Sequence, residues 1–121
     1  MKERRRFVRL DLNVNVKWKK IDQVEEIKEN TAKNISIGGI CLIVEEKLNE
    51  GDCLELKINL PNQKEIHAYG RVVWIDEYEI LGAEYGKKYD AGIEFLKIKE
   101  EDQQELEKFI FTFLYEKAKN R

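Results

Sequence analysis

The sequence is poor in the residues that build metal centres, disulfide frameworks and nucleophilic active sites. Its 121 residues include two cysteines, one histidine and one proline. Cys41 and Cys53 form no CxxC motif, so the three or four soft ligands of a zinc site are missing. No serine or cysteine is arranged with His67 for nucleophilic catalysis, and no paired-carboxylate or phosphate-loop motif is present. We therefore expect a protein that is not an enzyme and uses no metal and no cofactor.

Long apolar runs are also missing. No stretch approaches the roughly 20 residues that cross a bilayer, and the N-terminus is charged from Lys2 with no apolar segment behind it. We expect neither a membrane span nor a signal peptide. Without an export signal, the two cysteines are expected to be reduced and the protein to be cytoplasmic. The length fits a single domain, taken here as residues 1–121.

Charge is distributed unevenly along the chain. The formal net charge is −2, but residues 1–9 hold five basic residues and one acidic residue, a net charge of +4, so residues 10–121 carry −6. Four of the five basic residues are arginines, whose planar fork matches phosphate and the guanine O6/N7 edge. The acidic remainder disfavours broad nucleic-acid binding, which normally uses a basic face. We expect residues 1–9 to form a flexible basic arm that closes over an anionic ligand.

Alternating apolar and polar residues predict short, half-buried strands joined by turns. The expected strands are residues 10–18, 31–36, 40–44, 54–60, 65–76 and 91–95. Residues 19–30 and 77–88 are expected to be loops. The glycine pair Gly38-Gly39 allows positive φ and a tight bend before the third strand. In the fifth strand we expect Trp74 to pack in the core with Ile66 and Val72, and Arg71 to point the opposite way.

The period changes to that of an α-helix near the C-terminus. One apolar stripe recurs at i, i+3, i+4, i+7 and i+8, and consists of Leu106, Phe109, Ile110, Phe113 and Leu114. Acidic residues precede it and lysines follow it, which complements the helix dipole. The sequence therefore predicts an all-β core, a six-stranded antiparallel barrel over residues 10–97, with a helix over residues 100–119 packed on its open end. Deleting this helix should unfold the domain.

Two local motifs point to a ligand. The first is Arg5-x-x-x-Arg9, preceded by Arg4, and the second is Asn34-x-Ser36-x-x-Gly39. Taken separately, an arginine cluster is usually solvated surface and Asn-x-Ser with glycines is usually a turn. In this order, the two motifs resemble the PilZ domain family of bacterial cyclic di-GMP receptors. Two later segments resemble later strands of the same family, namely Gly70-Arg71-Val72-Val73-Trp74 and Ala91-Gly92-Ile93-Glu94-Phe95. The resemblance covers roughly residues 3–115.

The resemblance implies a site for cyclic di-GMP made of Arg5, Arg9, Asn34, Ser36, Gly39 and Arg4. It implies that Arg5 and Arg9 contact phosphate and guanine, and that Gly39 lets the backbone approach the ligand. The family often has aspartate at position 34, and asparagine here can donate as well as accept, which could lower the affinity. Arg6 and Arg71 are left open as contacts.

The expected function is a bacterial receptor that orders its arginine arm on binding cyclic di-GMP and passes the signal to an unidentified protein. Two alternatives stay open. One is a PilZ-like adaptor that works through protein contacts without binding the nucleotide. The other is a small barrel that binds single-stranded nucleic acid through its basic arm, with strong salt dependence.

Overall fold

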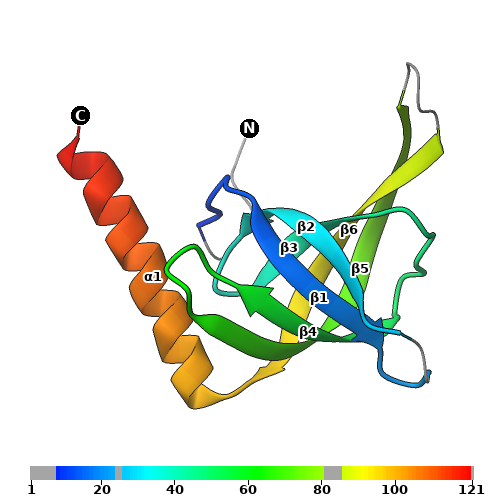
Figure 1. Ribbon diagram of the computed structural model, residues 1–121, viewed down its shortest axis with the longest axis horizontal. Helices are drawn as coiled ribbons and strands as arrows, with labels where there is room; N and C mark the ends of the chain where they lie inside the picture. The colour runs from blue at the N-terminus through cyan, green and yellow to red at the C-terminus, as the bar shows by residue number, and fades with distance from the viewer. Residues whose placement is uncertain (1–7, 24–25, 81–85, 121) are drawn as a thin grey trace.

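The computed structural model describes residues 8–23, 26–80 and 86–120. These residues form a closed antiparallel barrel followed by one helix (Figure 1). The strands are β1 (Val14–Lys20), β2 (Lys28–Ile35), β3 (Gly39–Val44), β4 (Cys53–Asn59), β5 (Glu65–Ile80) and β6 (Gly86–Ile98), and the helix is α1 (Glu100–Lys119). Around the barrel the strand order is β1-β2-β3-β6-β5-β4. The six-stranded barrel with a C-terminal helix expected from the sequence is therefore confirmed.

The barrel interior is filled by one face of each strand. In β4, for example, Leu54, Leu56 and Ile58 are fully buried, whereas the residues between them are exposed or half-buried. Trp18 on β1 is also buried, and its indole Nε1 donates a 2.9 Å hydrogen bond to Asn30 Oδ1 on β2. Alternate burial of this kind forms a single apolar core.

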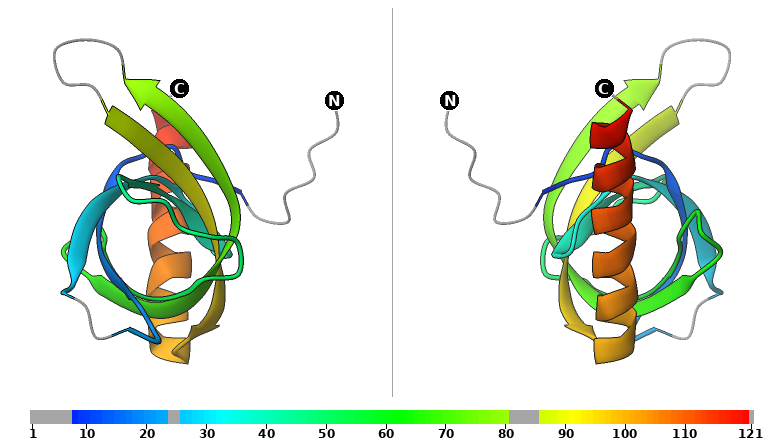
Figure 2. Two further views of the ribbon diagram at one scale, coloured as in Figure 1. Left: turned by 90° about the vertical axis from the view of Figure 1, so that its right-hand side faces the viewer. Right: turned by 90° about the vertical axis from the view of Figure 1, so that its left-hand side faces the viewer.

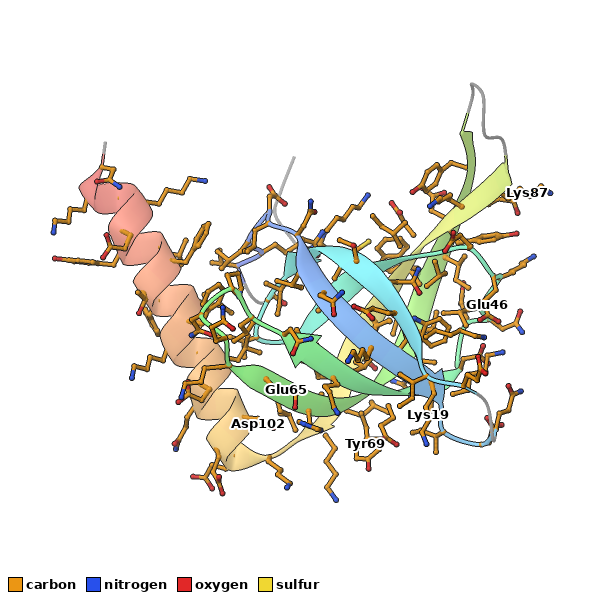
Figure 3. The ribbon with its side chains drawn as sticks, in the orientation of Figure 1. Lys19, Glu46, Glu65, Tyr69, Lys87 and Asp102 are labelled. Atoms are coloured by element: carbon orange, nitrogen blue, oxygen red, sulfur yellow. The ribbon has the colours of Figure 1, made fainter. Side chains whose placement is uncertain are left out.

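Helix α1 lies across one end of the barrel (Figure 2). Its N-cap, Lys99, makes no side-chain capping bond, but Asp102 in the first turn accepts a 3.0 Å hydrogen bond from the backbone N–H of His67 on β5. Figure 3 shows Asp102 and Glu65 near the start of the helix, where it meets β5. Leu106 and Ile110 are the buried residues of the helix, so its N-terminal half closes the barrel.

The first strand begins later than expected. The alternation from residue 10 suggested a strand over 10–18, but β1 starts at Val14. Leu10 instead makes an isolated antiparallel bridge with Ile35, and both residues are buried. The alternation from Leu10 to Trp18 therefore covers two separate pairings with β2, the Leu10–Ile35 bridge and the ladder that begins at Val14.

The loop expected at residues 77–88 is largely a strand extension. β5 continues to Ile80 and β6 starts at Gly86, with Glu77 opposite Tyr89 and Tyr78 opposite Lys88. Figure 1 shows this hairpin extending beyond the barrel. The buried Tyr89 connects the base of the extension to the core, and backbone pairing between β5 and β6 continues the ladder beyond it.

Both cysteines are free, as expected, with Cys41 buried and Cys53 exposed. Within the described part of the chain, no helix is long and apolar enough to cross a membrane.

Candidate ligand-binding groove

The end of the basic arm is attached to the barrel at Leu10. The Leu10 N–H donates to the Ile35 carbonyl at 2.8 Å, and the Ile35 N–H donates back to the Leu10 carbonyl at 3.1 Å. These two bonds hold the neighbouring Arg9 beside the end of β2. Arg9 is exposed and lines a groove on the outside of the barrel.

This groove has a volume of about 770 Å³. It runs over the outer surface of β3, β5 and β6 and reaches Gln103 in the first turn of α1. Asn34 and Ser36 line it near Arg9, and Trp74 lines it from β5. The volume lies in the range of small-molecule and nucleotide sites, roughly 300–1,000 Å³.

The groove floor contains one row of residues in register across four strands. Asn34 pairs with Cys41, Cys41 with Gly92, and Gly92 with Trp74. A Cβ at Gly92 would lie 2.1 Å from Trp74 Nε1, so the indole rests directly on the glycine backbone. The row therefore runs from a polar amide to a flat aromatic ring, with no bulky side chain between them.

Ser36 shapes the turn between β2 and β3. Its Oγ accepts hydrogen bonds from the backbone N–H groups of Gly38 and Gly39, at 3.1 and 3.2 Å. Its own N–H donates to the Gly39 carbonyl at 2.9 Å, whereas its hydroxyl makes only a 3.4 Å contact to that carbonyl. The hydroxyl oxygen is thus committed to the turn, and the hydroxyl proton is weakly engaged.

The structure shows a packing reason for glycine at position 39, separate from the approach of a ligand that the resemblance implied. A Cβ there would lie 2.1 Å from the backbone oxygen of Ile93 on β6. Glycine is therefore required by the close approach of β3 and β6. Neither Gly38 nor Gly39 adopts the positive φ that glycine allows, since Gly51 is the glycine with positive φ among the described residues.

The prediction that Trp74 packs in the core is wrong. The side chain is 39% exposed and lies on the groove floor. The β5–β6 register shifts between Val72 and Trp74, a β-bulge that reverses the alternation after Val72, which stays buried. Arg71, before the bulge, points outward as expected and forms an ion pair with Glu94, which itself lines the groove.

A small charged cluster lies beside the floor row. Lys33 on β2 forms an ion pair with the largely buried Asp90 on β6, and this hydrogen bond raises the pKa of Lys33. Burial raises the pKa of the Cys41 thiol to about 11, with the Asp90 carboxylate adding to the rise and Lys33 and Arg9 opposing it. Burial, with Asp90 again contributing, also raises the pKa of Tyr78. Cys41 is therefore a neutral part of the floor at pH 7, not a nucleophile.

The groove collects all four of the predicted site residues that the structure describes. Arg9, Asn34, Ser36 and Gly39 line it, although Arg9 lies far from the other three in the sequence. Arg4, Arg5 and Arg6 lie outside the described residues. Sequence reasoning missed Trp74 as a groove residue, and the Gly-x-x-x-Trp spacing on its own could not reveal the bulge that exposes it.

The groove offers binding groups rather than a catalytic arrangement. Arg9 supplies a cation, Asn34 an amide that donates and accepts, and Trp74 a stacking surface. His67 lies on the exposed part of β5, and its Nε2 is 3.1 Å from Glu65 Oε1. In the described ranges, no group of three or more His, Cys, Asp or Glu residues could hold a metal ion.

Comparison with known proteins agrees with this fold. The model of the PilZ domain family matches residues 3–112. A search of curated proteins found no match.

Several solved structures share the fold. The PilZ domain of YcgR from Escherichia coli, solved with c-di-GMP, has a TM-score of 0.74 and 19% identity, with 98% of this chain and 97% of that chain covered. The inhibitor of motility MotI/DgrA from Bacillus subtilis has a TM-score of 0.74 and 26% identity, over 96% of this chain and 54% of MotI. The complex of MrkH from K. pneumonia with c-di-GMP has a TM-score of 0.78 and 21% identity, over 99% of this chain and 57% of MrkH. The chain thus spans about half the length of MotI and MrkH.

Proposed function

Because the chain belongs to the PilZ domain family, we propose that it is a receptor for cyclic di-GMP and binds the dinucleotide in the groove described above. The observation that carries the proposal is the convergence of Arg9, Asn34 and Trp74 on one groove from three distant segments. A cation, an amide and an aromatic ring are the groups that a phosphate and a guanine require. The YcgR domain and MrkH, both solved with c-di-GMP, support the same ligand.

Each group has a distinct role in this proposal. Arg9 forms charge-assisted bonds to a phosphate or to the guanine O6/N7 edge, held in place by the Leu10 bridge. Asn34 pairs with a guanine edge, and the weakly engaged hydroxyl proton of Ser36 is available to a phosphate oxygen. A guanine stacks on the exposed face of Trp74. Binding with micromolar affinity requires a net of about −8 kcal/mol.

The arm completes the site. Arg5 and Arg4 precede the Leu10 anchor by only a few residues, so they can close over a ligand that already contacts Arg9. The four arginines of the arm repel one another until the phosphates neutralise them. Binding then orders the arm, and the new surface is presented to a downstream protein.

Calorimetric titration tests the proposal. Cyclic di-GMP should bind saturably, whereas GTP, cyclic di-AMP and a short oligonucleotide should not. Absence of heat and of any thermal shift at about 100 µM cyclic di-GMP would refute it and favour the adaptor that acts through protein contacts. Oligonucleotide binding with a steep salt dependence would favour the nucleic-acid alternative.

A matched pair of variants assigns the role of Arg9. Arg9→Ala should weaken binding by about 10- to 150-fold, the equivalent of losing one charged hydrogen-bonding group of about 1.5–3 kcal/mol. The melting temperature of the empty protein should stay within about 2 °C, since the side chain is exposed. Lys17→Ala, which removes an exposed cation from β1 outside the groove, should change neither quantity. A large loss of stability in Arg9→Ala would instead make Arg9 structural.

A further inference from the structure

The C-terminal half of α1 carries more apolar surface than the barrel covers. Phe111 and Tyr115 are 71% and 66% exposed, the highest values among the large exposed hydrophobic residues. Phe109 and Phe113 are only partly buried, with their ring centroids 6.2 Å apart. Figure 1 shows α1 extending past the barrel at this end. A contiguous patch of exposed apolar side chains marks an interaction surface.

A second groove of about 770 Å³ runs along this part of the helix. Phe109, Thr112 and Phe113 form its apolar part. Charged residues of α1 border it, namely Glu105, Lys108, Glu116 and Lys117, and the β4–β5 turn contributes Asn62 and Lys64. The groove is therefore an apolar strip with charges of both signs along its edges.

The helix sequence is complementary to its own reverse. Reading outward from Thr112 as far as Gln104 and Asn120, apolar residues occur at equal distances on both sides, and every charge in this range is matched by one of opposite sign. The matched positions are Phe111 with Phe113, Ile110 with Leu114, Phe109 with Tyr115, Lys108 with Glu116, Glu107 with Lys117 and Glu105 with Lys119. Gln104 and Asn120 continue the series.

We propose that this face binds a second copy of the chain, with the two α1 helices antiparallel and a two-fold axis at Thr112. At about 3.6 residues per turn, Glu105, Lys108, Thr112, Tyr115 and Lys119 lie along one stripe of the helix. A two-fold axis uses the same surface on both copies, so each matched pair on this stripe, such as Lys108 with Glu116 and Glu105 with Lys119, occurs twice. Lys108 meets Glu116 of the partner subunit, and Phe109 meets Tyr115 of the partner subunit.

The charges select this orientation. A parallel pair would place Lys108 beside its own counterpart and Glu116 beside its own, which is repulsive. In the antiparallel pair these repulsions become attractions. Across the described residues, Lys108 and Glu116 take part in none of the recorded ion pairs, so both are available to a partner.

The contact is small, so the pairing is weak. A 20-residue helix is about 30 Å long, and one helix pair falls at the low end of specific interfaces. We expect a monomer–dimer equilibrium that depends on concentration and weakens with salt, because the exposed ion pairs are screened.

Sedimentation velocity on the full chain tests the proposal. From about 10 µM to about 500 µM, a range suited to weak pairing, the mean mass should rise from 14.4 kDa toward twice that value. Lys108→Glu and Glu116→Lys should each weaken self-association by about 10-fold, since each creates two like-charge contacts per dimer. An equimolar mixture of these two variants should dimerise, because each then supplies the charge that the other needs.

The mixture separates pairing from misfolding, since a misfolded variant would not be rescued by a second one.

A matched aromatic control compares Tyr115→Ala, which should weaken the dimer, with Tyr69→Ala, which should not. Figure 3 shows Tyr69 on the outside of the barrel, away from the C-terminal half of α1. A wild-type protein that stays monomeric throughout, or two variants whose mixture stays monomeric, would overturn the proposal and leave the face to a different protein.

Discussion

Replacing Gly39 with alanine should destabilise the barrel, because β3 and β6 approach too closely there for a side chain. The new Cβ would lie 2.1 Å from the backbone oxygen of Ile93 and 3.2 Å from Glu94 Cα. Both neighbours are backbone atoms, so no rotamer change relieves the overlap. The two strands must separate by about 1.4 Å to reach an ordinary contact distance of about 3.5 Å.

The cost follows from what that separation disturbs. Forcing an extra methyl group into a packed position costs about 1–3 kcal/mol. Separation also lengthens the 2.8 Å hydrogen bond from the Phe95 N–H to the Gly38 carbonyl, worth about 0.5–1.5 kcal/mol. Alanine recovers about 0.4–1 kcal/mol by restricting the unfolded chain. The net loss is about 0.5–4 kcal/mol with a central value near 2 kcal/mol, or roughly 8 °C in melting temperature for a domain of this size.

Thermal and urea unfolding of the empty protein measure this loss, with Gly86→Ala as the matched control. A Cβ at Gly86 meets nothing within 4 Å, so its melting temperature should stay within about 2 °C of wild type. An unchanged melting temperature in Gly39→Ala would refute the packing argument. If that variant also lost cyclic di-GMP binding, Gly39 would serve the close approach of the ligand instead.

Further predictions concern the groove floor and the helix. Trp74→Ala should weaken cyclic di-GMP binding about 5- to 150-fold in a calorimetric titration, the equivalent of losing one base stack of about 1–3 kcal/mol. It should lower the melting temperature less than Trp18→Ala does, because Trp18 is only 2% exposed in the wild-type protein. Burial raises the pKa of Cys41 from 9.0 to about 11. The stabilisation linked to its protonated thiol is therefore complete below pH 9 and is lost as the pH rises toward 11. Urea unfolding between about pH 8 and about pH 10.5 should show this loss, and Cys41→Ala should reduce it. Leu106→Ala should cost about 2–5 kcal/mol in the same unfolding assay, since this residue is fully buried between α1 and the barrel; a loss below about 1 kcal/mol would show that the helix is not part of the core.

The fold was predictable wherever one face of an element is buried and the other is not. Strand β4 buries Leu54, Leu56 and Ile58 and exposes most of the residues between them, so its period of two is visible in the sequence. Helix α1 likewise shows its period through Leu106 and Ile110. Beyond the buried Tyr89, the hairpin residues Tyr78, Lys87 and Lys88 are exposed or half-buried, so no period of two marks this part of the sequence. The extension of the hairpin could not be inferred from a pattern of burial.

The candidate site was partly predictable for a related reason. Arg9, Asn34 and Ser36 were found because their motifs are short and local, and the structure brings them to one groove. The reason for Gly39 was not predictable, since the atom that excludes a Cβ belongs to Ile93, more than 50 positions away in the sequence. A local pattern can indicate that a glycine is needed, but only the pairing of β3 with β6 shows which neighbour requires it.

The polar and aromatic ends of the floor row owe their positions to two irregularities in the sheet. The register shifts between Ala32 and Asn34 on β2, and again between Val72 and Trp74 on β5. Without the second shift, strict alternation would place Trp74 on the buried side with Val72, where an indole would have to displace core residues. Gly92 on β6 is the residue paired with Trp74 on β5. Because Gly92 has no side chain, the exposed ring lies on backbone instead of on a side chain. The bulge on β5 and the glycine on β6 are therefore needed together: the bulge turns Trp74 outward, and Gly92 leaves the space that makes the ring part of the groove floor.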